Sequence, residues 1–145
     1  MIRNIIKDTD PQLRKISREI EQFDQKISRI FDDLNDTLDR EEGVGLAAPQ
    51  VALLKRAFII KYDNFYRECA NPVILKKEGE QTGPEGCLSV DNRQATIKRP
   101  YKIWVEYQDR YGNKKEEVLE GFQAVVFCHE RDHLDGILFY DHIGE

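Results

Sequence analysis

Two histidines near the end of the chain have the spacing of a metal site. His129 and His133 stand four residues apart in the stretch FCHERDHLDG, and Glu130 follows the first of them. On a helix, residues i and i+4 lie on one face, so both imidazoles can bind one metal ion. Glu130 would project about 100° around the helix, beside the metal, where its carboxylate can move a proton to or from water. The stretch therefore predicts metal-assisted hydrolysis.

A plain core helix could contain the same residues. Counting back three, four and seven residues from His129 gives Val126, Val125 and Phe122, so the histidine face continues an apolar face. A charged, solvated helix would not show this continuity. Apolar surroundings strengthen a charged metal site through their low dielectric, but they suit an ordinary core helix equally well. The motif alone leaves these two interpretations open.

A catalytic metal of this kind needs a third protein ligand and leaves a further position to water. The carboxylates of Asp132 and Asp135 are on the same stretch, but their spacing takes them off the histidine face. The other candidates are the three thiols of the chain, Cys69, Cys87 and Cys128.

The three thiols differ in their sequence surroundings. Cys128 directly precedes His129 and would point roughly 100° away from it on a helix. Cys69, in RECANP, falls at an expected strand-to-turn step and is typical of a core thiol. Cys87 follows Gly86 in PEGCLSV, and a glycine lets the backbone approach a partner closely. Chemistry alone favours Cys87.

The stretch GVGLAAPQ, residues 43–50, could offer bare backbone groups to an extended peptide. It lacks the Gly-Lys-Ser/Thr of a phosphate-binding loop. Gln50 ends the apolar run, and a buried amide needs hydrogen-bond partners. It could cap a local turn or donate to an oxyanion.

The elements that must position these residues can be predicted from periodicity. Residues 24 to about 41 show apolar side chains at helical spacing, with Asp24 as N-cap and Gly43 as a stop. Helical character returns from Phe122 to about Asp135, with Gly136 just beyond. Strands are expected between the helices, at 57–61, 72–78, 95–98, 102–108 and 114–119. The prediction is an α+β fold, with antiparallel β-sheets packed around the C-terminal helix and an N-terminal amphipathic helix.

Length and composition limit the class of protein. The 145 residues, with 40% apolar content and no linker, suit one catalytic domain spanning 1–145. The net charge of -5 argues against direct binding of nucleic acid. No apolar run reaches the roughly 18 residues of a membrane span, and no signal peptide is evident, so we expect a cytoplasmic protein. Three cysteines in such a protein do not suggest a disulfide framework.

Three blocks together resemble the peptide deformylases: GVGLAAPQ at 43–50, EGCLS at 85–89 and HERDHLDG at 129–136. The resemblance covers nearly the whole chain, including DPQLR near the start, NPVI at 71–74 and the closing GILFYDHI. By this resemblance, Cys87, His129 and His133 are the metal ligands. The metal expected in the cell is Fe²⁺, with Zn²⁺, Ni²⁺ or Co²⁺ able to substitute.

The resemblance also implies roles for the other matching positions. Glu130 corresponds to the general acid/base, and Gln50 with the backbone N–H of Leu88 to the groups that polarise the formyl oxygen. Backbone pairing with the substrate falls on Val44, Gly45 and Gly86. The pocket for the methionine side chain falls on Phe122, Val125 and Val126.

The implied reaction is hydrolysis of the N-formyl group from the initiator methionine of new polypeptides. Metal-bound water attacks the formyl carbon, Glu130 transfers the proton to the leaving amine, and formate is released. The substrate is an N-formylmethionyl peptide, the ribosome near the nascent-chain exit is a candidate partner, and a monomer is expected.

The chain departs from the family pattern at Pro84, Asp91, Cys128 and Arg131. These departures concern the rim of the cleft rather than the ligands, and Arg93 is either a rim residue or a solvated surface arginine. Two other hypotheses remain: a different HExxH hydrolase such as a peptidase, and a non-catalytic peptide-binding or structural metal domain. The peptidase would require a carboxylate or a third histidine as ligand. Release of formate from formyl-Met-Ala-Ser distinguishes a deformylase from both.

Overall fold

The computed structural model describes residues 1–145. Its elements are, in chain order, two α-helices, seven strands and three short 3₁₀ helices. The α-helices are α1 (Gln25–Leu38) and α2 (Phe122–Leu134). The strands are β1 (Gly45–Ala47), β2 (Ala57–Tyr62), β3 (Phe65–Glu78), β4 (Gln81–Cys87), β5 (Val90–Arg99), β6 (Lys102–Gln108) and β7 (Lys114–Glu120). The 3₁₀ helices are η1 (Pro11–Arg14), η2 (Ala48–Val51) and η3 (Phe139–His142).

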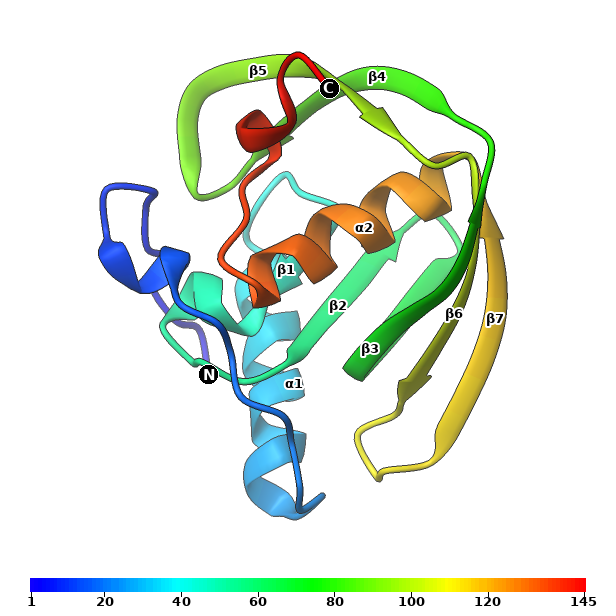
Figure 1. Cartoon of the computed structure of the whole chain (residues 1–145). Helices are drawn as coiled ribbons and strands as arrows, with labels where there is room; N and C mark the ends of the chain where they lie inside the picture. Colours follow the sequence, from blue (N-terminus) through cyan, green and yellow to red (C-terminus); the bar gives the residue numbers. More distant parts are fainter.

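The strands form two antiparallel sheets around α2 (Figure 1). The larger sheet has the order β1-β2-β3-β6-β7, and β4 pairs with β5 in a separate two-stranded sheet. Helix α2 contacts β1, β2 and β7 of the larger sheet and β5 of the smaller one. The predicted α+β architecture, with sheets packed around the C-terminal helix, is therefore confirmed.

Helix α1 begins where the sequence predicts. The Asp24 side chain accepts hydrogen bonds from the N–H groups of Lys26 and Ile27, which satisfies two donors of the first turn. The helix ends at Leu38 rather than near residue 41. Its apolar face stops at Leu38, so the charged residues that follow have no core contact to hold them in a helix.

The strands are longer than their sequence patterns suggest. β3 starts at Phe65, so Cys69 lies inside a strand and not at the predicted strand-to-turn step. β4 was not predicted, because Gly83, Pro84 and Gly86 are all unfavourable in strands. Proline is tolerated there because β4 has β5 as its only strand neighbour and keeps a free edge.

Helix α2 is delimited by two glycines with positive φ. Gly121 is the N-cap at φ 60°, and Gly136 follows the helix at φ 73°. A Cβ atom on Gly136 would lie 2.5 Å from the carbonyl oxygen of Arg14, so the close approach of the N-terminal segment also requires glycine. These limits fix which residues of α2 face the sheets.

Two large apolar clusters hold the elements together. One packs the larger sheet against α2 and includes Phe58, Ile103 and Phe127, whose ring meets that of Phe58 edge to face. The other packs α1 against β1 and β2 and includes Phe31 and Ile59. Helix α2 thus covers one face of the larger sheet and α1 covers the β1–β2 part of the other face, and α2 lies between the two sheets. Nowhere does a helix combine the length and the apolar character that crossing a membrane requires.

Candidate active site

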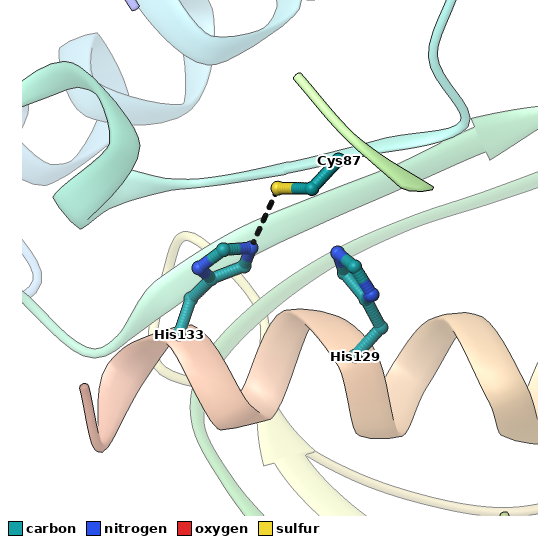
Figure 2. A group of neighbouring side chains, drawn as sticks. All are labelled: Cys87, His129 and His133. Atoms are coloured by element: carbon teal, nitrogen blue, oxygen red, sulfur yellow. Dashed lines mark hydrogen bonds between the residues drawn. The ribbon is translucent and has the colours of Figure 1, made fainter. Parts of the chain in front are cut away.

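Cys87, His129 and His133 converge on one point between the two sheets (Figure 2). Cys87 is the last residue of β4, and the two histidines are one turn apart on α2. Their ligand atoms all lie within 4.8 Å of one another, and Cys87 Sγ is 3.4 Å from His133 Nε2. The imidazole rings are 5.1 Å apart and inclined at 73°. One sulfur and two nitrogens thus face a common space.

This donor set fits a divalent transition metal. Three protein ligands with a further open position are the arrangement of catalytic rather than structural sites. Burial lowers the pKa of His133, so its imidazole stays neutral, which is the form that binds a metal. Burial also opposes charging of His129, but its contacts with Cys87 and Glu85 outweigh this and raise its pKa to about 10. Metal binding at His129 therefore releases a proton.

The other two thiols lie away from the cluster. Cys69 and Cys128 are both buried in the core between α2 and the larger sheet. Burial raises the pKa of Cys69 and raises that of Cys128 to about 11, so both stay as unreactive thiols. Of the three sequence candidates, only Cys87 belongs to the cluster.

Glu85 orients the first histidine. Its Oε1 is 2.9 Å from His129 Nδ1. This contact keeps the proton on Nδ1 and leaves Nε2 for a metal, as carboxylates commonly do for ligating histidines. Burial disfavours the Glu85 carboxylate, but hydrogen bonds from Arg99 and His129 outweigh burial and hold its pKa at about 2.

Arg99 holds Glu85 in turn. The guanidinium donates from Nε and Nη2 to the two Glu85 oxygens at 2.9 Å each, and from Nη1 to Asp132 at 2.7 Å. Asp132 is also 2.8 Å from His142 Nε2 on η3. Sequence reasoning missed Glu85 and Arg99. Glu85 stands inside the EGCLS block, but nothing in the sequence signals that a buried arginine on β5 would reach it.

Glu130 lies beside the cluster, without belonging to it. It is 3% exposed, and burial raises its pKa to about 7, close to neutrality. Its Oε1 has no hydrogen-bond partner within the chain. Gly45 packs against the carboxylate so closely that a Cβ there would lie 2.6 Å from Oε2. The carboxyl can therefore exchange a proton near neutral pH, and any side chain at position 45 would displace it.

Gln50 presents its amide N–H to the same space. Its Oε1 accepts from the Ala47 N–H at 2.9 Å, which fixes the amide orientation. Its Nε2 then donates to Ser89 Oγ at 3.1 Å and lies 3.5 Å from Cys87 Sγ. The amide both closes the turn of η2 and points a donor at the cluster. No hydrogen bond within the chain takes up the N–H of nearby Leu88.

A cavity of about 660 Å³ opens onto the cluster. Eleven of the twelve predicted site residues line it, and the twelfth, His133, lies buried at its base beside Cys87. Its apolar lining includes the predicted trio on α2, Phe122, Val125 and Val126. Its walls include the predicted backbone positions Val44, Gly45 and Gly86.

The four departures from the family pattern were expected at the rim of the cleft, but only Pro84 lines the cavity, together with Arg93. Cys128 is buried in the core. Asp91 lies outside it and pairs with Lys7 at 3.1 Å. Arg131 reaches from α2 to the Pro72 carbonyl oxygen at 3.2 Å.

Comparisons with known proteins identify the family. The sequence model of the Polypeptide deformylase family matches residues 2–145. "Peptide deformylase 2" of Clostridium acetobutylicum is 48% identical over 145 residues, covering 99% of this chain and 97% of its own. "Peptide deformylase" of Caldicellulosiruptor bescii is 46% identical over 142 residues, covering 98% of this chain and 86% of its own.

Solved structures show the same fold. The peptide deformylase of Thermotoga maritima superimposes with a TM-score of 0.96 at 37% identity, over 100% of this chain and 99% of that one. A Met-Ala-Ser-bound peptide deformylase of Acinetobacter baumannii gives 0.94 at 29% identity, over 99% of each chain. With a family match along nearly its full length, relatives at this identity and the same fold, the chain belongs to the polypeptide deformylase family, whose members are hydrolases acting on formyl-methionyl peptides.

Proposed function

We propose that this protein hydrolyses the N-formyl group from the initiator methionine of newly made polypeptides and releases formate. One observation carries the proposal: a thiol, two imidazoles, a buried carboxyl and an amide N–H converge at one end of a cavity lined by apolar side chains. Family membership supports the same reaction class.

Cys87, His129 and His133 would hold one divalent metal ion. When bound, such an ion acts as a Lewis acid and lowers the pKa of a coordinated water, so that water can react near neutral pH. A thiolate beside two imidazoles suits iron, zinc, nickel or cobalt better than magnesium or calcium. Fe²⁺ is the ion we propose for the cell, with the other three able to substitute.

Glu130 is the proposed general acid/base. Its buried carboxyl has a pKa of about 7, so it can accept a proton from the attacking water and return it to the leaving amine. Because Oε1 makes no hydrogen bond within the chain, that oxygen is available to the water. Gly45 leaves the space that the carboxylate occupies, since a Cβ there would lie 2.6 Å from Oε2.

Gln50 and Leu88 are the proposed oxyanion donors. Attack at the formyl carbon places negative charge on the formyl oxygen, and donors already in position stabilise that charge. The Gln50 amide is locked by Ala47 and Ser89, so its Nε2–H needs no reorganisation. The Leu88 N–H is not engaged within the chain and lies on the same wall of the cavity.

The cavity fits a formylmethionyl peptide. Phe122, Val125 and Val126 offer an apolar pocket for the methionine side chain, a preference worth about 1–3 kcal/mol per methylene. The peptide would pair with the backbone of Val44, Gly45 and Gly86, as an added strand does. The Acinetobacter relative was solved with Met-Ala-Ser bound, and a bound peptide that begins with methionine supports a methionyl peptide as the ligand.

The setting of the reaction follows from its substrate. We propose one catalytic domain over residues 1–145 that acts as a monomer in the cytoplasm, on chains as they leave the ribosome. Gel filtration tests whether the protein is a monomer, and sedimentation with and without ribosomes tests whether it binds them. Neither measurement depends on the chemistry.

The test is release of formate from formyl-Met-Ala-Ser by protein purified and assayed without oxygen, compared with the same preparation in air. We expect formate and Met-Ala-Ser as products, and loss of activity in air when Fe²⁺ is bound. Glu130→Gln should keep the metal and lose at least about a hundredfold in rate, the range of general acid–base catalysis. Cleavage of the Met-Ala bond instead would indicate a peptidase. Metal binding without any hydrolysis would indicate a structural or peptide-binding domain.

A further inference from the structure

Arg93 stands at the mouth of the cavity without an acidic partner. Seven of the eleven arginines form an ion pair with a carboxylate: Arg3, Arg14, Arg56, Arg67, Arg99, Arg110 and Arg131. Arg93 forms none, is exposed, and is the one unpaired arginine that lines the cavity. Its charge is therefore available to a ligand.

The Arg93 side chain is nevertheless held in place. Its Cζ lies 4.0 Å from the centroid of the Tyr140 ring, which is a close cation–π contact. Tyr140 is fixed in turn, because its hydroxyl donates to Asp8 Oδ2 at 2.9 Å. A guanidinium stacked on a ring keeps its N–H groups free at the edge, and these groups match the two oxygens of a carboxylate.

Arg93 lies near the proposed path of the substrate peptide. Gly86 lies against the next strand, and a Cβ there would be 3.9 Å from the Arg93 carbonyl oxygen and 3.6 Å from Gln94 Cγ. A peptide paired with Gly45 and Gly86 would carry its residues beyond the methionine out of the cavity. Extended residues advance by about 3.3 Å each, so the first two of them pass the rim where Arg93 lies.

We propose that Arg93, held over Tyr140, is a specificity-determining residue that favours an acidic side chain at the second or third position of the formylated peptide. This inference rests on the proposed deformylase activity. Glu42, just before β1, lines the same cavity and carries the opposite charge. Glu42 is therefore the matched control: removing its charge should not weaken the preference that Arg93 creates.

The probes are formyl-Met-Ala-Glu and formyl-Met-Ala-Gln, both with amidated C-termini, and the same pair with the acidic residue at position two. Amidation removes the chain-terminal carboxylate, which would otherwise present the same chemistry to Arg93. Formyl-Met-Ala-Gln with a free C-terminus tests that second source separately. The readout is the ratio of kcat/KM for the acidic peptide to that for its amide counterpart.

For the unmodified protein we expect a ratio of about two to five at low salt, the range of an exposed charge pair. The difference should lie in KM and shrink towards one in high salt, since exposed charges are screened. Arg93→Gln should bring the ratio to about one, Tyr140→Leu should lower it, and Glu42→Gln should not lower it.

Two results would overturn the inference: a ratio of one in the unmodified protein at both positions, or a ratio that persists in Arg93→Gln. A preference shown only by the peptide with a free C-terminus would assign Arg93 to the terminal carboxylate and also overturn it. Failure of the proposed function is separate, because formyl-Met-Ala-Gln amide would then release no formate at all.

Discussion

Replacing Arg99 by methionine should weaken the support of His129, one of the three proposed metal ligands. Arg99 and Glu85 are 5% and 8% exposed, and three guanidinium hydrogen bonds join Arg99 to Glu85 and Asp132. Methionine fills much of the volume but donates no hydrogen bond. Glu85 would then remain buried with His129 Nδ1 as its only partner.

Two energies follow from this geometry. Removing one member of a buried ion pair costs about 3–5 kcal/mol of folding stability, because the other charge stays buried. This is a large part of the roughly 5–15 kcal/mol that stabilises an ordinary domain. Without Arg99, burial favours the protonated form of Glu85, which no longer accepts a hydrogen bond from His129 Nδ1. Loss of a carboxylate behind a ligating histidine lowers metal affinity by about 10–100-fold, so we expect a loss of about 1.4–2.7 kcal/mol in metal binding.

Arg67→Met is the matched control. Arg67 also makes a two-pronged pair, with Glu117, but its side chain is 33% exposed, and the pair joins β3 to the edge strand β7 without contacting the cluster. A pair this exposed contributes about 1 kcal/mol or less. Its loss should leave metal affinity unchanged.

Urea unfolding of the metal-free variants measures the loss of folding stability, and competition for Zn²⁺ against a chelating dye measures the loss of metal affinity. We expect Arg99→Met to lose at least about 2 kcal/mol more unfolding free energy than Arg67→Met, the difference between a buried and an exposed pair. Equal stabilities, or an Arg99→Met protein that binds Zn²⁺ as tightly as the unmodified chain, would refute the reasoning.

Three further changes test other parts of the site. Gly45→Ala should still bind Zn²⁺ but lose most of the deformylation rate, because the new Cβ meets Glu130 Oε2 at 2.6 Å. Gly83→Ala is the control: a Cβ there has nothing within 4 Å, so Zn²⁺ binding and rate should both stay unchanged. Ser89→Ala removes the 3.1 Å acceptor of Gln50 and should lower kcat with little change in KM, at a stability cost of about 1 kcal/mol; a change confined to KM would contradict the role of Gln50. Iodoacetamide at pH 8, read by mass spectrometry, should modify only Cys87 in the metal-free protein and none with metal bound, because burial raises the pKa of Cys69 and raises that of Cys128 to about 11. Modification of Cys128 in the folded protein would contradict its burial.

The helical half of the site could be predicted from sequence because local geometry determines it. The i, i+4 spacing of His129 and His133 fixes their shared face on any helix. The choice of Cys87 over Cys69 and Cys128 needed more, since residues some forty positions apart meet only through the pairing of β4 with β5. The resemblance of the EGCLS block supplied that information before any geometry was known.

The support around the ligands could not be predicted in the same way. Glu85, Arg99 and Asp132 come from β4, β5 and α2, and the partners of their bonds are separated by 14, 33 and 44 residues. The members of such a network show no regular spacing in the sequence from which the network could be predicted. The sequence placed Asp132 off the histidine face, and that was correct: the carboxylate turns away from the cluster and binds Arg99.

The unusual residues next to the ligands illustrate why the chain can vary there. Cys128 precedes His129 by one position and therefore faces the core, where it packs with Phe127 and the larger sheet. Arg131 follows Glu130 and faces β3, where its guanidinium donates to the Pro72 carbonyl oxygen. Each helix position turns about 100° from the last, and this rotation turns Cys128 and Arg131 away from the two histidines. Changes at 128 and 131 alter how α2 is anchored and leave the donor atoms in place, whereas a change at Arg93, distant in sequence, reaches the cavity itself.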